Sequence, residues 1–197
     1  MNATEWLNAL RETAQKPAIP ILSFPSVSLL GINVQELVSS EDLQAGGMKA
    51  ISERVPSGAA VSMMDLSVEA EAFGSAVRFD PMDVPAVTNI IVHNEAEARA
   101  LEVPSVGAGR TGLYISAIAK AARLIQDRPV FAGMIGPFSL SGRLLGVSET
   151  LLYCYDDPEL VEIVMEKATR FLIDYALAYK QTGALGVVIA EPLTGLL

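Results

Sequence analysis

The sequence is poor in cysteine and histidine, with one of each, Cys154 and His93, in 197 residues. No disulfide can therefore form within the chain, and no Cys/His cluster has the spacing of a zinc site. A single thiol is typical of a reducing compartment, so we expect a cytoplasmic protein. Cys154, in LLYCYDDP, is expected to be a buried thiol between two helical segments. His93, in NIIVHNEAE, is expected to be a surface or capping residue.

Basic residues are also scarce: 14 Lys and Arg stand against 23 Asp and Glu, which gives a net charge of -9. With no basic run, the chain lacks the cationic surface that a nucleic-acid partner requires. Long apolar runs are missing too, because PVFAGMIGPF and GALGVVIA fall short of the roughly 18 residues that span a bilayer. MNATEWLNALRETAQK has no cationic head before an apolar stretch, so it does not resemble a signal peptide. We expect neither a nucleic-acid nor a membrane partner.

Hydrophobic residues make up 51% of the chain and charged residues 19%, a composition typical of a globular domain with a large core. Four short apolar runs predict buried parallel strands. They are Ala18 to Phe24, Gly58 to Asp65, Pro129 to Gly136 and Gly183 to Glu191. The alternation of strands and helices predicts an α/β fold, either an open doubly wound sheet or a (β/α)8 barrel. The stretch 66–128 is too long for one crossover and should hold an excursion, RFDPMDVPAVTNIIV, over one end of the sheet.

Capping signals predict where the helices begin. Ser39 or Ser40 can cap a helix that the pair Gly46-Gly47 weakens or bends, and Asn94 can cap EAEARAL. A further helix is expected over Arg110 to Gln126. Asp157-Pro158 should start a long helix that reaches Gln181, with Leu160, Val164, Ala168, Phe171, Tyr175 and Ala178 toward the core. Its charges at Glu162, Glu166, Arg170 and Asp174 should form a solvated face.

In a parallel α/β fold, function gathers where strands end and helices begin. Asp65 ends the second predicted strand, where partial desolvation would raise its pKa and suit proton transfer or cation stabilisation. The alternative is that Asp65 caps the next helix through a backbone N–H. Residue types alone leave both roles open.

The third strand leads into GPFSLSGRLLG. Its glycine lets the backbone approach a ligand, its proline fixes the turn, and free amides at Phe138, Ser139 and Leu140 would suit a carboxylate or phosphate. Arg143 lies one turn further and could reach the same anion. The fourth strand ends at Glu191, which places another acid at this end of the sheet. The candidate binding residues are Gly136, Pro137, Phe138, Ser139, Arg143 and Glu191.

Residues Gly107 to Gly112, GAGRTG, match the GxGxxG dinucleotide fingerprint and open a helix. They follow LEVPSV, whose proline breaks a strand, and they do not form the first strand–helix turn. The next strand ends in Gly-Pro where the fingerprint requires an acid. We therefore do not expect nucleotide binding at this motif.

Three stretches resemble the uroporphyrinogen decarboxylase family, closest to its corrinoid-dependent methylcobamide methyltransferase branch. They are MMDLSVEAEAFGSAVRF, VFAGMIGPFSLSGRLLG and DPELVEIVMEKATRFLIDYALAYKQTGALGVVIAEP. The resemblance spans nearly the whole chain and includes a Gly/Arg loop at the GxGxxG match. It implies a (β/α)8 TIM barrel of which this chain, as a single domain over residues 1–197, supplies roughly the first half, incomplete at its C-terminus.

The resemblance also implies a chemistry. In the methyltransferase branch a thiol or tetrahydrofolate acceptor takes a methyl group from a corrinoid carried on a partner protein, with zinc held by a His-x-Cys pair and a later Cys. Those ligands would lie beyond this chain, which alone is expected to be inactive. Asp65 and the GPF turn would line the cavity that receives the corrinoid.

Two alternatives remain within the resemblance. The first is uroporphyrinogen decarboxylation, for which Asp65 matches the pyrrole-binding aspartate. However, PILSFPSVSLLGINVQEL lacks the expected arginines, and the region of the expected tyrosine reads SLSGRLLG. The second alternative is a noncatalytic tetrapyrrole- or corrinoid-binding relative.

Overall fold

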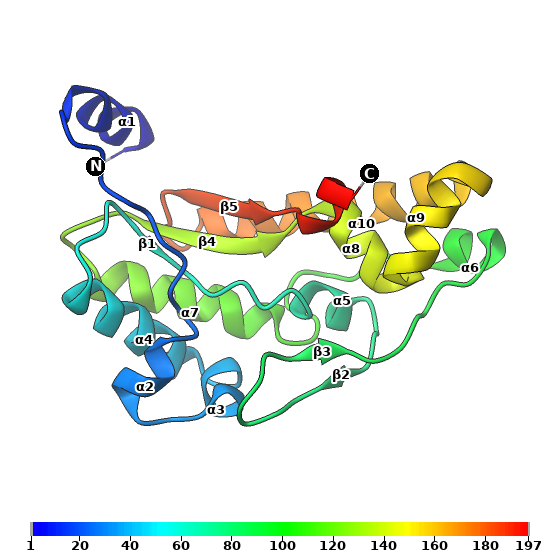
Figure 1. Ribbon diagram of the computed structural model, residues 1–197, viewed down its shortest axis with the longest axis horizontal. Coiled ribbons are helices and arrows are strands. Elements are labelled where there is room, and N and C mark those ends of the chain that lie inside the picture. Colours follow the sequence, from blue (N-terminus) through cyan, green and yellow to red (C-terminus); the bar gives the residue numbers. More distant parts are fainter. Residues whose placement is uncertain (1, 197) are drawn as a thin grey trace. The chain divides into compact units, whose positions relative to one another are not determined.

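Three of the four apolar runs form strands of one sheet in the computed structural model, which describes residues 2–196 (Figure 1). The strands are β1 (Ala60–Val61), β4 (Val130–Ile135) and β5 (Gly186–Ala190), and their order across the sheet is β1-β4-β5. β1 pairs with β4 in parallel, with Ala60 opposite Val130. Two backbone hydrogen bonds join β4 and β5, from Leu185 N to Val130 O and from Gly136 N to Ala190 O. The residue numbers rise in both strands from the first bond to the second, so this pair is parallel as well. The expected parallel α/β arrangement is confirmed for these strands.

The prediction of a strand over Ala18 to Phe24 is wrong, because residues 18–22 belong to no helix or strand and residues 23–25 form a turn. The segment does lie beside β1: Gly58 N donates to Ala18 O over 2.9 Å, and Ser23 Oγ donates to Val61 O over 2.9 Å. Pro20 lacks an N–H and so interrupts the donor pattern that a ladder needs. The run therefore follows the sheet without joining it.

The chain divides into two compact units. The first unit contains the described residues up to Met63 together with Leu113–Gly133 and Ala178–Val188. Its helices before β1 are α1 (Ala3–Glu12), α2 (Ser26–Leu30), α3 (Val34–Val38) and α4 (Glu41–Arg54), and most of α7 (Thr111–Leu124) also belongs to it. Ser40 caps α4 by accepting the Leu43 N–H, which confirms the second of the two proposed caps. α4 continues through Gly46-Gly47, where a Cβ at Gly47 would meet the Ser26 side chain.

The second unit contains Met64–Gly112, Met134–Leu177 and the described residues from Ile189 onward. It begins with α5 (Val68–Ala72), followed by the antiparallel pair β2 (Val77–Arg78) and β3 (Ala86–Val87) and then α6 (Glu95–Ala100). The predicted excursion is thus a short hairpin, visible as the β2–β3 pair in Figure 1. After β4 come α8 (Pro137–Leu145), α9 (Val147–Asp156), most of α10 (Pro158–Lys180) and the 3-10 turn η1 (Pro192–Leu196).

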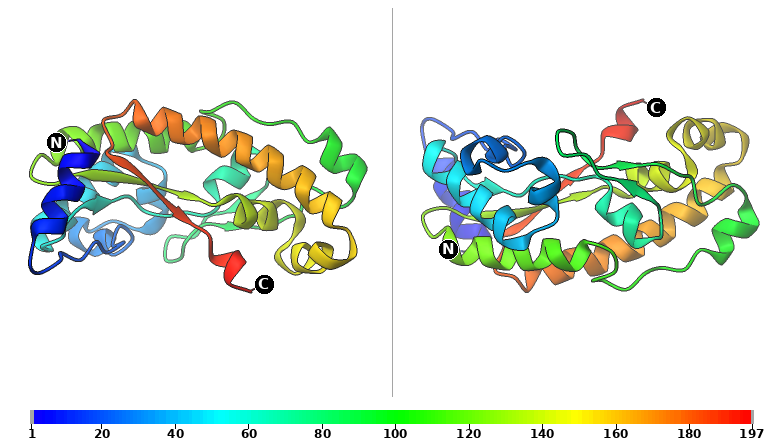
Figure 2. Two further views of the ribbon diagram at one scale, coloured as in Figure 1. Left: turned by 90° about the horizontal axis from the view of Figure 1, so that it is seen from above. Right: turned by 90° about the horizontal axis from the view of Figure 1, so that it is seen from below.

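The helix signals of the second unit also hold. Asn94 accepts the Glu97 N–H at the start of α6, and Asp157 accepts the Leu160 N–H at the start of α10. α10 then runs without a break, as the orange and yellow helix of Figure 2 shows. Its predicted inner residues are buried from Leu160 to Tyr175, whereas Ala178 is only half-buried. The four charged residues predicted on its outer face are all exposed.

Cys154 corrects an expectation, since it lies within α9 and is only half-buried. α9 buries Thr150 alone and exposes Leu152 and Tyr155, so this surface helix has no interior position for the thiol. His93 is exposed, as predicted. Among residues 2–196, no helix has both the length and the apolar character needed to cross a membrane.

Candidate functional site

A cavity of about 280 Å³ lies in the second unit, where the chain leaves β1. Residues Met64 to Ser67 form one side of it, and Val84 to Val87 of the β2–β3 hairpin form another. Arg143, in the last turn of α8, completes the lining. Two of the candidate residues, Asp65 and Arg143, are therefore brought together around one concavity.

Asp65 is held in a buried ion pair. Its Oδ2 lies 2.5 Å from Arg110 Nη1, and its side chain has no exposed surface. Oδ1 accepts two bonds from Ser67, one from the backbone N–H at 3.1 Å and one from Oγ at 2.6 Å. Ser67, rather than Asp65, is the N-cap of α5, and no side chain caps that helix. The carboxylate thus orders the turn that lines the cavity and does not cap the following helix.

Arg110 connects three segments of the second unit. Besides Asp65, it pairs through Nε with Glu71 Oε2 at 2.6 Å and donates from Nη2 to Ser67 Oγ at 2.9 Å. Its guanidinium carbon lies 4.8 Å from the centre of the Phe79 ring, within the range of a cation–π contact. A planar guanidinium with five donors can serve two carboxylates and a hydroxyl at once, which an ammonium does less well.

Arg110 was not among the residues that the sequence singled out for the site. It belongs to the GxGxxG match, where Gly109 has a positive φ of 54° and packs against α5 so closely that a Cβ would lie 3.3 Å from Ala72 N. The glycine spacing therefore lets this loop approach α5 and present Arg110 to Asp65. In the sequence, the available signal was an arginine set among three glycines, Gly107, Gly109 and Gly112.

Glu69, one turn beyond Asp65, is a second buried carboxylate at this end of the sheet. Its Oε1 accepts the N–H of Ile135, the last residue of β4, at 3.1 Å, and its Oε2 has no hydrogen-bond partner among the described residues. Burial raises the pKa of Glu69 to about 7, the neighbouring Asp65 charge adds to the rise, and the Ile135 N–H opposes it. Arg110 is already shared by Asp65 and Glu71, so Glu69 has little positive charge to stabilise its ionised form.

The first turn of α8 differs from the prediction. The amides of Phe138 and Ser139 are not free, because both donate to the Glu191 carboxylate, at 3.1 and 2.6 Å. The protein's own side chain therefore fills the expected anion site. Gly136 serves the same contact, since a Cβ there would collide with the carboxylate of Glu191.

The remaining candidates form a cluster of their own. Gly136 is the N-cap of α8 and Pro137 is its first residue. Ser139 Oγ accepts the N–H of Leu193 at 3.0 Å, which ties η1 to α8. The cluster of Gly136, Pro137, Phe138, Ser139 and Glu191 does not contribute to the lining of the 280 Å³ cavity as the described residues form it. Of the α8 candidates, Arg143 alone faces that cavity.

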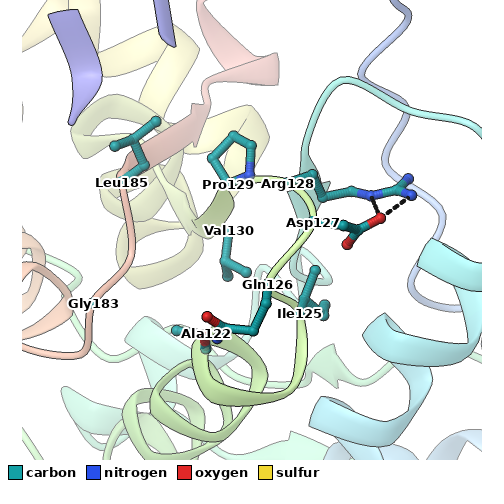
Figure 3. Close-up of a pocket in the computed structure, with 9 residues that line it drawn as sticks. All are labelled: Ala122, Ile125, Gln126, Asp127, Arg128, Pro129, Val130, Gly183 and Leu185. Carbon is teal, nitrogen blue, oxygen red and sulfur yellow. Dashed lines mark hydrogen bonds and ion pairs between the residues drawn. The ribbon is translucent and has the colours of Figure 1, made fainter. Parts of the chain in front are cut away.

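A different hollow, of about 200 Å³, lies in the first unit and is shown in Figure 3. It is lined by residues that precede β4 and β5, among them Gln126, Asp127, Arg128 and Gly183. Arg128 is occupied there, with Asp127 Oδ2 at 2.6 Å and the carbonyl of Val55 at 3.0 Å. Strand starts are the stability face of barrel folds, whereas sites form at the strand ends. The cavity beside Asp65 is therefore the better candidate.

No metal-binding set is present in this part of the chain: residues 2–196 contain no group of three His, Cys, Asp or Glu side chains placed to hold an ion. The described residues thus contain no complete ligand set for the zinc that the family resemblance implies. What the site offers is a partly apolar cavity, an ordered buried ion pair and one arginine.

Comparison with known proteins gives a consistent family. The family model described as uroporphyrinogen decarboxylase (URO-D) matches residues 17–197. Methylcobamide:CoM methyltransferase MtbA of Methanosarcina acetivorans is 29% identical over 130 residues, which cover 65% of this chain and 38% of that protein. Methylated-thiol--coenzyme M methyltransferase of Methanosarcina mazei is 27% identical over 138 residues, 68% of this chain and 36% of that protein. The chain thus spans well under half the length of these curated relatives.

A solved structure shows the same fold. A methyltransferase from Methanosarcina mazei superposes with a TM-score of 0.84 at 24% identity, and the match covers 96% of this chain and 58% of that one. The architecture described above is therefore the same as that of the corresponding part of the M. mazei methyltransferase. It agrees with the TIM-barrel type predicted from the sequence.

Proposed function

Because the chain belongs to the uroporphyrinogen decarboxylase family, we propose that the protein containing it is a corrinoid-dependent methyltransferase. It would move a methyl group between a methylated corrinoid protein and a small acceptor, a thiol or tetrahydrofolate. The observation that carries the proposal is the similarity to known enzymes, since MtbA of M. acetivorans and the M. mazei thiol enzyme are both methyltransferases. The cavity at the strand ends supports the proposal, because barrel enzymes carry their sites in this part of the fold.

In the direction of thiol methylation, the reaction needs a sulfur nucleophile aligned with the methyl group and shielded from water. A methylated corrinoid would supply the methyl group and keep the electron pair of the broken carbon–metal bond, while the acceptor sulfur would take the methyl group and release its proton. The residues of this chain would contribute binding and orientation. The Asp65–Arg110 pair orders the turn that lines the cavity, and Arg143, which also lines it, would present a cation to the bound molecule.

The remaining candidates would act indirectly in this scheme. Glu191 and the turn from Gly136 to Ser139 fix the start of α8 and thereby the position of Arg143. The apolar residues Val84 to Val87 would exclude water from one side of the cavity.

Methyl transfer can be tested on the protein expressed from its complete reading frame. With methylcobalamin and a thiol, the absorbance of the methylated corrinoid should fall while mass spectrometry detects the methyl thioether. Asp65→Asn and Arg143→Gln should lower the rate by roughly tenfold to a hundredfold, as expected for a lost charged contact. Arg170→Gln, on the exposed face of α10, is the control and should leave the rate unchanged.

Two results would contradict methyl transfer. Release of CO₂ from uroporphyrinogen with formation of coproporphyrinogen, without thioether, would establish a decarboxylase. Binding of corrinoid or porphyrinogen with neither product would establish a noncatalytic relative.

A further inference from the structure

Arg143 is the most unusual basic residue of the second unit. The other basic side chains there are either bonded, like Arg99, Arg110 and Lys167, or exposed to solvent, like Arg78 and Arg170. Arg143 is partly buried, and no hydrogen bond or ion pair to it occurs within residues 2–196. Arg143 therefore differs from the exposed arginines Arg78 and Arg170 in being partly withdrawn from water while it has no acidic partner among the described residues.

The acid that lines the same cavity does not compensate this charge. Asp65 lines the same cavity, but its side chain is fully buried and its oxygens accept from Ser67 and Arg110. The negative charge of Asp65 is thus used within the ion pair. The cavity wall therefore carries the positive charge of Arg143 without a matching negative charge on the opposite side.

Arg143 also lies where two hollows meet. The 280 Å³ cavity beside Asp65 and a second one of about 220 Å³, lined by Thr88 to Ile90, Gly142, Gly146 and Val147, share Arg143 and Val87. The rest of the first cavity is largely apolar, with Leu66 and the residues Val84 to Val87. A molecule that fits here would place an anionic group at the arginine and an apolar body against the hairpin.

We propose that Arg143 binds the anionic group of a substrate, a carboxylate, sulfonate or phosphate, and so determines which molecule the cavity accepts. This inference rests on the proposed function, because it identifies the charge class of a substrate at the same site. A guanidinium that is partly removed from water forms strong paired bonds with such oxyanions. Two substrates of the proposed reaction carry one: an acidic thiol acceptor such as 2-mercaptoethanesulfonate, and a corrinoid with a phosphate in its nucleotide loop.

The first experimental arm tests whether the anionic group that Arg143 binds belongs to the methyl acceptor. The full-length protein and its Arg143→Gln variant are assayed with 2-mercaptoethanesulfonate and with the neutral 2-mercaptoethanol. If the anion is on the acceptor, the variant should lose roughly tenfold to a hundredfold in kcat/KM for the sulfonate and little for the neutral thiol. Arg143→Lys should recover part of the preference, because it restores the charge without the paired geometry.

The second arm tests whether the anionic group that Arg143 binds belongs to the corrinoid. Binding of methylcobalamin is compared with binding of methylcobinamide, which lacks the nucleotide loop and its phosphate. Weakened binding of the former alone in Arg143→Gln would place the anion on the corrinoid. Arg170→Gln serves as the matched loss of an exposed arginine in both arms, and unchanged melting temperatures show that the variants are folded.

The inference fails if Arg143→Gln behaves like Arg170→Gln in both arms. Anion binding can be tested separately from methyl transfer by ligand-detected NMR with 2-mercaptoethanesulfonate and inorganic phosphate. Anion binding that depends on Arg143 in a protein without methyl transfer would leave the inference intact and overturn the proposed function. Absence of anion binding by the wild-type protein in NMR, with no charge preference in either arm, overturns the inference.

Discussion

Ser139 and Glu191 bind each other across two segments 52 residues apart: the Ser139 N–H donates to Glu191 Oε1 at 2.6 Å. The same carboxylate accepts the Phe138 N–H, so one side chain satisfies two of the amides that α8 leaves open. It also places a negative charge at the positive end of the helix. This contact explains why the predicted anion site binds an internal group.

Glu191→Ala should therefore destabilise the protein and expose an anion site. Loss of the cap is expected to cost about 1–3 kcal/mol in the free energy of unfolding, measured by urea denaturation. Sulfate should raise the melting temperature of this variant more than that of the wild type at matched ionic strength, because it can replace the carboxylate. Glu166→Ala, on the exposed face of α10, is the control. Equal responses to sulfate in all three proteins would show that the amides do not attract anions.

Gly136→Ala should be destabilising for a steric reason. The added Cβ would overlap the Glu191 carboxylate and also lie 3.1 Å from the Glu191 Cβ, which cannot move away by a side-chain rotation alone. Overpacking of this kind typically costs about 1–3 kcal/mol. Gly46→Ala in α4 is the matched control, because a Cβ added there would meet nothing within 4 Å and alanine favours a helix by up to about 1 kcal/mol. A Gly136→Ala protein as stable as Gly46→Ala would contradict the close approach.

The Asp65–Arg110 pair can be tested by a double-mutant cycle in urea unfolding. Arg110→Met should cost about 3–5 kcal/mol, because it leaves a fully buried carboxylate without its cation. Asp65→Asn should cost less, about 1.5–3 kcal/mol, since Arg110 keeps Glu71 and Ser67. The double variant should be less destabilised than the sum of the two. Additive costs would show that the two side chains do not interact.

Glu69 predicts a pH dependence with a defined sign. Its pKa is about 7 in the folded protein, against an ordinary value of 4.5. Between pH 4.5 and pH 7 the folded state therefore binds more protons than the unfolded state. The contribution of Glu69 to stability is therefore full below pH 4.5 and decreases as the pH rises to about 7, by roughly 3 kcal/mol at most. Asp65 and Arg110 are the charged groups that act on Glu69: the charge of Asp65 raises its pKa further, and Arg110, which also pairs with Glu71, limits the rise.

Glu69→Gln isolates this contribution, because glutamine keeps an oxygen for the Ile135 N–H and cannot ionise. Unfolding free energies measured at pH 5, 6, 7 and 8 should fall less steeply in the variant than in the wild type. Parallel curves for the two proteins would mean that Glu69 does not titrate in this range.

The helix starts and the parallel arrangement of β1, β4 and β5 could be predicted from the sequence, whereas the individual long-range contacts could not. Asn94 and Asp157-Pro158 mark helix starts because a cap acts on residues within its own turn. The run Ala18 to Phe24 has the apolar composition of a strand, but Pro20 has no N–H to donate to a neighbouring strand. The composition of a segment indicates whether it is buried, but whether it pairs in a sheet depends on the strand beside it.

The candidate site shows the same division. Asp65 and Arg143 were identified because both follow strand ends, a rule that needs only the order of elements. Arg110 was missed because its contact with Asp65 joins residues 45 apart. The Glu191 contact with α8 was missed for the same reason, so amides that look open in the sequence are occupied in the fold. The roles of these residues in binding remain predictions.

The β2–β3 hairpin has a consequence for how substrate preference can change during evolution. One arm places Phe79 against Arg110, and the other arm places Val84 to Val87 along the cavity. The residues between them, 80–83, form the turn, and Met82 there is almost fully exposed. Substitutions near the second arm can reshape the cavity while the ion pair and the sheet stay in place. Insertions at residues 80–83 would instead alter both arms together, so relatives with different substrates should differ in side chains at 84–87 more than in the length of this turn.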